Sequence, residues 1–109
     1  MRLAGRAAVV TGSSRGVGRS VALAYAAEGA DVLVNYSASE GPALELVEEI
    51  KRLGRKSVAV RADVASKAEV ENMMAAAKEA FGRLDIVVNN AGFTRPAMIH
   101  KMTESEWDA

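Results

Sequence analysis

The sequence predicts an α/β fold with a doubly wound parallel sheet. Short apolar runs of strand length alternate with segments whose apolar residues recur at helical spacing. One helical segment joins each pair of successive runs, and a glycine-rich turn follows the first run. Helical crossovers return the chain in the same direction, so we expect parallel strands with right-handed connections.

Four strands are predicted from these apolar runs. They are Ala7–Thr11, Asp31–Asn35, Ser57–Arg61 and Leu84–Asn89. The second and fourth runs are β-branched and nearly all apolar, which is typical of strands buried on both faces of a parallel sheet.

The first predicted helix begins near Gly16 and ends at Glu28, with Gly29 as its C-terminal cap. Its expected apolar face consists of Val17, Val21, Ala24 and Tyr25. The second helix carries an apolar stripe before Gly54, made of Ala43, Leu46, Val47, Ile50 and Leu53. Such a stripe is expected to pack against the sheet.

The third predicted helix starts with a capping box, Ser66-Lys-Ala-Glu69, and ends before Gly82. Its stripe consists of Val70, Met73, Met74, Ala77 and Phe81. Because the methionines lie on this stripe, they are predicted to pack in the core and not to form a methionine-rich binding surface.

A fourth helix is expected to begin at the end of the sequence. Thr103-Glu-Ser-Glu106 is another capping box, yet the sequence stops at Ala109. One helical turn is not stable alone. We therefore expect residues 1–109 to be the N-terminal dinucleotide-binding part of a domain that is truncated in its fourth helix.

Composition limits the function classes. Lys plus Arg and Asp plus Glu both number 14, so the net charge is zero and electrostatic binding to nucleic acid or anionic membranes is not expected. There is no cysteine, which excludes disulfides and cysteine–zinc sites, and no metal site is predicted. No apolar run is long enough for a membrane span or a signal peptide, so a cytoplasmic location is expected.

The strongest functional signal is the glycine-rich turn, Thr11-Gly12-Ser13-Ser14-Arg15-Gly16-Val17-Gly18. A helix N-terminus that follows such a turn presents backbone N–H groups to an anion, and glycines let the chain approach a pyrophosphate closely. The spacing is G-x-x-x-G-x-G, which differs from the common dinucleotide fingerprint. A P-loop is excluded because no lysine precedes Lys51. A tight strand-to-helix connection that binds nothing is the alternative.

The residues near the second strand indicate the cofactor. That strand ends Asn35-Tyr36-Ser37, with no carboxylate before Glu40 to hold the ribose 2′-hydroxyl of NAD. Arg15 lies in the glycine turn, where its guanidinium would reach a 2′-phosphate, although a solvated surface arginine is the alternative. This combination favours NADP (NADPH) over NAD.

A second motif, Asn89-Asn90-Ala91-Gly92, follows the fourth strand. With the glycine turn, it resembles the classical short-chain dehydrogenase/reductase family, and Asp63-Val64 after the third strand also fits. Within the family the chain is most similar to 3-oxoacyl-[acyl-carrier-protein] reductases, which act in fatty acid biosynthesis. The resemblance covers all 109 residues but only about the first two-fifths of such an enzyme. It implies a Rossmann-type sheet with strand order 3-2-1-4.

The resemblance also implies the cofactor-binding residues. Those at the phosphate and adenosine end are Gly12, Ser14, Arg15, Gly16, Val17 and Gly18. Tyr36 and Ser37 would lie near the 2′-phosphate, and Asp63 and Val64 would flank the adenine. The residues that would line the nicotinamide ribose are Asn90, Ala91 and Gly92. Thr11 would hold the turn by a hydrogen bond to the Asn89–Gly92 segment.

No catalytic residue is predicted in this chain. Family members use a Ser, a Tyr-x-x-x-Lys pair and an Asn, all beyond the last residue of this sequence. Tyr25 and Tyr36 are followed four residues later by Gly29 and Glu40, so neither forms the pair. His100 is interpreted as a surface residue.

Two functions follow as hypotheses. The first is the NADP(H)-binding part of an oxidoreductase that reduces a carbonyl, such as a 3-oxoacyl thioester, by hydride transfer, with the 109-residue chain itself inactive. The alternative is a non-catalytic nucleotide-binding or self-assembling module. An open fourth-strand edge carrying Ile86, Val87 and Val88 would then favour a homo-oligomer.

Overall fold

A five-stranded sheet forms the centre of the protein. The structure, a computed structural model, describes residues 2–14, 16–90 and the backbone of 97–100. The strands are β1 (Ala7–Val10), β2 (Asp31–Tyr36), β3 (Ser57–Arg61), β4 (Ile86–Asn89) and β5 (Ala97–His100). They lie in the order β3-β2-β1-β4-β5. The first four are parallel, which confirms the predicted order 3-2-1-4.

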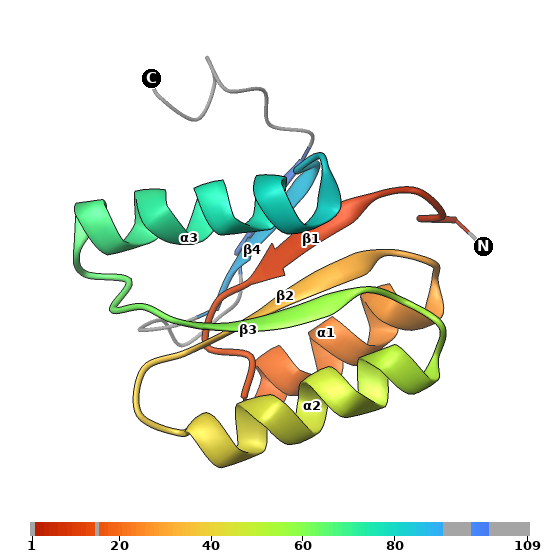
Figure 1. Ribbon diagram of the computed structural model, residues 1–109, viewed down its shortest axis with the longest axis horizontal. Helices are drawn as coiled ribbons and strands as arrows, with labels where there is room; N and C mark the ends of the chain where they lie inside the picture. The colour runs from red at the N-terminus through yellow and green to blue at the C-terminus, as the bar shows by residue number, and fades with distance from the viewer. Residues whose placement is uncertain (1, 15, 91–96, 101–109) are drawn as a thin grey trace.

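Three helices cover the two faces of the sheet. They are α1 (Gly16–Ala27), α2 (Glu40–Arg52) and α3 (Lys67–Phe81). Figure 1 shows α1 and α2 together on one face and α3 on the other, so the predicted doubly wound arrangement is confirmed. Among the described residues, no helix is both long enough and apolar enough to cross a membrane.

The outer edge of β4 is occupied, so the prediction of an open edge there is wrong. Strand β5 pairs antiparallel with β4, with Met98 opposite Val88. An antiparallel return needs only a short connection, and it satisfies the N–H and C=O groups that β4 would otherwise expose. Self-association through that edge loses its basis. The expected fourth helix, beginning at Thr103, lies outside the described residues.

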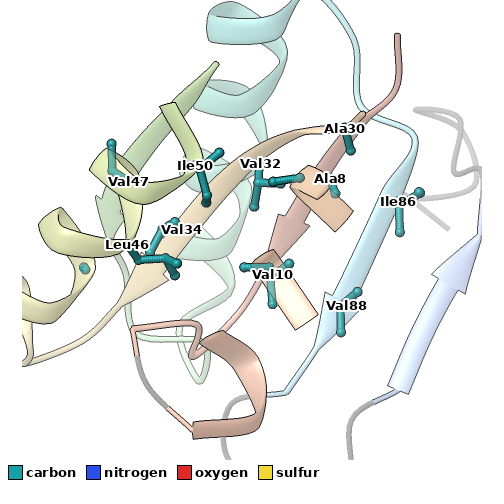
Figure 2. Close-up of a cluster of buried hydrophobic side chains, with 13 residues drawn as sticks. Ala8, Val10, Ala30, Val32, Val34, Leu46, Val47, Ile50, Ile86 and Val88 are labelled. Atoms are coloured by element: carbon teal, nitrogen blue, oxygen red, sulfur yellow. The ribbon is translucent and has the colours of Figure 1, made fainter. Parts of the chain in front are cut away.

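The core has two parts because the parallel strands are buried on both faces. Val10, Val32 and Val34 point toward α1 and α2, where Figure 2 shows them facing Leu46 and Ile50 of α2. Alternate strand residues and the inner face of α3 form the second cluster. Its buried members are Val9, Leu33, Ala62, Met73, Met74, Ala77 and Val87. The methionines are core residues, as predicted.

Helix α1 follows its predicted face only in part, because Val21 and Tyr25 pack against the core as predicted whereas Val17 and Ala24 do not. Gly18, Ala22 and Ala26 are its buried residues, whereas Val17 is 58% exposed and Ala24 is also exposed. The fully buried positions lie one residue after Val17, Val21 and Tyr25, so the buried face is turned toward Gly18, Ala22 and Ala26. Small side chains at these positions let α1 lie close against the sheet. This close packing of the helix takes precedence over burying the side chain of Val17.

Helix α2 buries four members of its predicted stripe, but Leu53 is 44% exposed because it is the C-cap and lies past the last turn.

At the start of α3 only half of the predicted capping box forms. Ser66 Oγ accepts from Glu69 N at 3.3 Å. The Glu69 carboxylate instead accepts from Asp63 N at 2.9 Å, since Ser66 N already donates to Asp63 O.

Asp85 ties β1 to β4 at the amino ends of these strands. Its carboxylate accepts from Ala7 N at 2.9 Å and from two nitrogens of Arg83, both at 2.6 Å. Arg6 lies 3.4 Å away. Burial raises the pKa of Asp85, but the Arg83 and Ala7 hydrogen bonds and the positive charges outweigh it, so the pKa is lowered overall.

We expect Asp85→Asn to lower the free energy of unfolding by about 1–2 kcal/mol at pH 7, because it removes a charge that is hydrogen-bonded across two strands, while the half-exposed Arg83 limits the loss. A lowered folded-state pKa stabilises the protein above the unfolded-state pKa, ordinarily near 3.8, and this contribution is lost as the pH falls through the folded-state value. Urea unfolding at pH 7 and at a series of lower pH values measures both effects, and the difference between the two proteins is expected to shrink as the pH falls below 3.8.

The matched control for this prediction is Glu48→Gln, which breaks an exposed ion pair with Lys51. Solvent-exposed pairs contribute little, so this variant is expected to unfold like the unmodified protein. Equal losses in the two variants would contradict the role assigned to Asp85.

Candidate functional site

A pocket of about 340 Å³ lies beyond the carboxyl ends of β1, β2 and β3. Three separate segments line it: the turn after β1, the end of β2 with the following loop, and the residues after β3. The lining residues are Gly12, Ser14, Asn35, Tyr36, Ser37, Ala38, Ser39, Ala62, Asp63 and Val64. In open α/β sheets, this edge is where ligands bind.

The structure brings together six of the residues that the sequence placed at a cofactor site. Those that line the pocket are Gly12, Ser14, Tyr36, Ser37, Asp63 and Val64. Three more, Gly16, Val17 and Gly18, form the first turn of α1. Asn90 follows β4 and contacts the glycine turn, as described below. Three others, Arg15, Ala91 and Gly92, lie outside the described residues.

At Gly18 the backbone of α1 lies in close contact with the backbone of the glycine turn. A Cβ atom there would lie 2.4 Å from Gly12 O, 2.8 Å from Asn90 Nδ2 and 2.9 Å from Ser13 Cα. No real Cβ atom tolerates such distances to backbone. Gly12 and Gly16 have positive φ values of 59° and 67°, which disfavour other residues. The three motif glycines are therefore explained by two different steric requirements.

The first turn of α1 gives this edge of the sheet its electrostatic character. The first N–H groups of a helix have no partner within the helix, and the helix dipole places partial positive charge there. The first turn contains Gly16, Val17 and Gly18. Directly behind a glycine turn, such an arrangement favours a phosphate or another anion.

Thr11 connects the glycine turn to the segment after β4. Its Oγ1 accepts from Asn90 N at 2.8 Å and donates toward Val88 O and Asn89 Oδ1, each at 3.3 Å. Asn90 Nδ2 in turn donates to Gly12 O at 3.4 Å. The predicted hydrogen bond between Thr11 and the Asn89–Gly92 segment is thus confirmed for Asn90.

Charged residues of both signs flank the loop after β2, with Glu40 at the start of α2 and Arg61 at the end of β3. Tyr36 Oη, at the end of β2, donates to Glu40 Oε2 at 3.2 Å. Desolvation, together with the Glu40 charge and hydrogen bond, raises the pKa of Tyr36, while Arg61 opposes the rise. Arg61 lies opposite Tyr36 in the sheet, and its Nε donates to Ser37 O at 3.1 Å. Glu40 therefore reaches the end of β2, although it lies four residues further along the chain.

Asp63 enters the pocket from the turn after β3. Its Oδ1 accepts from Ala65 N at 2.9 Å, which is the hydrogen bond of an Asx turn. Its own N–H donates to Glu69 at the start of α3. These two bonds fix the loop after β3, which lies beside the end of β2, where Ala62 N donates to Tyr36 O at 3.0 Å. Within residues 2–14 and 16–90, no cluster of His, Asp and Glu could hold a metal ion.

Asn35 is a site residue that the sequence analysis did not identify. It was interpreted only as the end of the second strand, yet its side chain is 2% exposed and lines the pocket. A polar amide at the end of an otherwise apolar, doubly buried strand was the available signal, because buried polar groups need hydrogen-bond partners.

Comparison with known proteins agrees with this geometry. A sequence model of the family described as short chain dehydrogenase matches residues 6–109. The 3-oxoacyl-[acyl-carrier-protein] reductase FabG of Staphylococcus aureus is 50% identical over 103 residues, which cover 94% of this chain and 42% of the reductase. The chain thus spans about two-fifths of the length of that curated relative.

Solved structures show the same arrangement. A short chain dehydrogenase from Burkholderia cenocepacia in complex with NADP matches with a TM-score of 0.83 and 44% identity, over 99% of this chain and 44% of that one. A hydroxysteroid dehydrogenase from Escherichia coli matches with a TM-score of 0.77 and 37% identity, over 84% and 39% of the two chains.

We expect Gly18→Ala to lower the free energy of unfolding by about 1–3 kcal/mol, because the added methyl group must displace the backbone of Gly12 and Ser13. Thermal and urea unfolding measure the loss. Gly41→Ala is the matched control, since a Cβ atom at Gly41 meets nothing within 4 Å and the residue lies within α2. Alanine is the better helix former, so this control is expected to be neutral or slightly stabilising. Similar losses in both variants would contradict the steric explanation.

Proposed function

The chain belongs to the short chain dehydrogenase family, and from that premise we propose that it is the NADP(H)-binding part of a carbonyl reductase. One observation carries the proposal: six residues from three distant segments, each matched to the family's cofactor site, line one pocket beside the glycine turn. Its volume of about 340 Å³ falls in the range of small-molecule sites. The complex of the Burkholderia relative with NADP supports the same cofactor class.

Each part of the pocket has a role in this proposal. The first turn of α1 offers N–H groups to the pyrophosphate. Tyr36 and Ser37 lie on the side that would receive the 2′-phosphate, and Asp63 and Val64 would flank the adenine. Asn90, held by Thr11, would line the nicotinamide ribose together with Ala91 and Gly92.

NADP(H) fits the charges better than NAD(H). The pocket-lining loop Ser37-Ala38-Ser39 offers hydroxyl and backbone groups and no carboxylate. The acid that follows, Glu40, is hydrogen-bonded to Tyr36 Oη. Arg61 supports the loop through Ser37 O. In this proposal Arg15, a residue of the glycine-rich motif, would supply a guanidinium to the 2′-phosphate. Guanidinium groups match phosphate in charge and geometry.

The proposed reaction is the reduction of a carbonyl, with a 3-oxoacyl thioester as the substrate class suggested by the Staphylococcus relative. Bound NADPH would supply the hydride. The residues of this chain would bind and orient the cofactor, and no Tyr-x-x-x-Lys pair occurs among the 109 residues. The alternative is a nucleotide-binding module without catalytic activity. Both candidates require NADP(H) binding, and they differ only in turnover.

Calorimetry with NADPH and NADH tests cofactor choice. We expect NADPH to bind more tightly, and Arg15→Ala to weaken NADPH by about tenfold or more while it changes NADH little, because only NADPH carries the charged 2′-phosphate. Lys51→Ala removes a positive charge from the end of α2, within its last turn, and serves as the control. Equal losses for the two cofactors would refute the role of Arg15.

An assay of NADPH oxidation tests whether the 109-residue chain only binds the cofactor or also catalyses the reaction. We expect the 109-residue chain, freed of host reductases, to oxidise no NADPH in the presence of a 3-oxoacyl thioester, because it lacks the tyrosine–lysine pair that would protonate the product oxygen. The full-length Staphylococcus reductase is the positive control. Steady turnover that co-purifies with the chain would show that its own residues suffice for catalysis.

A further inference from the structure

We propose that the Asn35 side chain is a positioning residue, which fixes the conformation of the glycine turn and joins that turn to the opposite wall of the pocket. The inference rests on the function proposed above for its consequences in cofactor binding. Asn35 lies at the carboxyl end of β2, between the glycine turn after β1 and the end of β3. Its side chain is buried at 2% exposure.

The side chain of Asn35 contacts backbone groups of three segments. Its Oδ1 accepts from Gly12 N at 2.9 Å. Its Nδ2 lies 3.2 Å from Ala62 O, 3.3 Å from Val60 O and 3.4 Å from Tyr36 O. One amide therefore holds the first glycine of the turn on its acceptor side and the ends of β2 and β3 on its donor side.

An amide is the side chain that suits this position. Asparagine has an acceptor oxygen and two N–H donors, so it satisfies the Gly12 N–H and shares its two protons among three carbonyls. Leucine has a similar size but satisfies none of these groups. An ionised aspartate keeps the acceptor for Gly12 N–H but faces the carbonyls of Val60 and Ala62 without a donor. A buried donor or acceptor that loses its hydrogen-bond partner lowers the free energy of unfolding of the protein.

The consequence concerns the two walls of the pocket. Gly12 is a lining residue on the phosphate side, and Ala62 precedes Asp63 on the proposed adenine side. Because one buried amide binds both segments, their separation is set before any ligand enters. The Gly12 N–H is also directed to Asn35, so the first turn of α1 is left to supply donors to a pyrophosphate.

The main-chain bonds at this position are independent of the side chain. Ser13 N donates to Asn35 O, and Asn35 N donates to Ser13 Oγ, both at 3.0 Å. They remain available in any variant at position 35. The side-chain contribution can therefore be tested while the strand and the turn stay joined.

The test compares Asn35→Asp and Asn35→Leu with the unmodified 109-residue chain. Both variants are expected to bind NADPH about tenfold or more weakly, the size expected when buried hydrogen-bonding groups lose their partners. Amide hydrogen exchange at Gly12, followed by NMR without cofactor, supplies a second readout. The Gly12 amide is expected to be protected in the unmodified chain and in Asn35→Asp, which keeps the acceptor, and to exchange rapidly in Asn35→Leu.

Ser57→Ala is the matched control. Ser57 is a buried polar residue at the first position of β3, away from the pocket, and its hydroxyl donates to Val32 O at 2.8 Å. Its loss is expected to lower the unfolding temperature without changing NADPH affinity or Gly12 exchange. A position-35 variant that lowered only the unfolding temperature, as the control does, would overturn the positioning role.

The exchange readout separates this inference from the proposed function. If the unmodified chain binds neither NADPH nor NADH, the proposed function fails, and Gly12 protection still decides whether Asn35 fixes the turn. Rapid exchange of the Gly12 amide in the unmodified chain would overturn the inference, even if the variants at position 35 do not fold.

Discussion

The close approach of α1 to the turn after β1 is the constraint on which the rest of the structure depends. At Gly18 there is no room for a Cβ atom between the helix and the Gly12 carbonyl. This contact brings the start of α1 to the edge of the sheet, and the small residues Ala22 and Ala26 continue it along the helix. The N-terminus of the helix therefore lies next to the glycine turn, where the N–H groups of a first helical turn favour an anion.

Buried polar side chains complete the carboxyl edge of the sheet. Parallel strands leave backbone groups without partners where they end, and these groups need hydrogen bonds when they are buried. Thr11 bonds the segment after β4, Asn35 bonds the ends of β2 and β3, and Asn90 bonds the glycine turn. Among these three side chains, Asn35 also lines the pocket. At the amino ends of the strands, Asp85 ties β1 to β4.

The fold was largely predictable because its signals are local. The doubly buried strands read as continuous apolar runs, and the stripes of α2 and α3 matched the buried faces. The errors share a cause in packing between separate elements, which the periodicity within one element does not reveal. Val17 looked like a core residue, but the close contact at Gly18 turned the helix so that Val17 is exposed. The pairing of β5 with β4, and the hydrogen bond that Asp63 N donates to Glu69, depend on which partner lies nearest in space.

By itself, the sequence determined the alternation of strands and helices, the positions of the glycines and the resemblance that ordered the sheet, because these follow from periodicity and from motifs within a few residues. Only the tertiary structure decided that Gly12, Tyr36 and Asp63 line one pocket, and that Asn35 joins the segments they belong to. The physical reason is that a hydrogen bond between residues 23 or more positions apart leaves no pattern in either segment. A buried asparagine signals that a partner exists, and only the packed sheet shows which groups it binds.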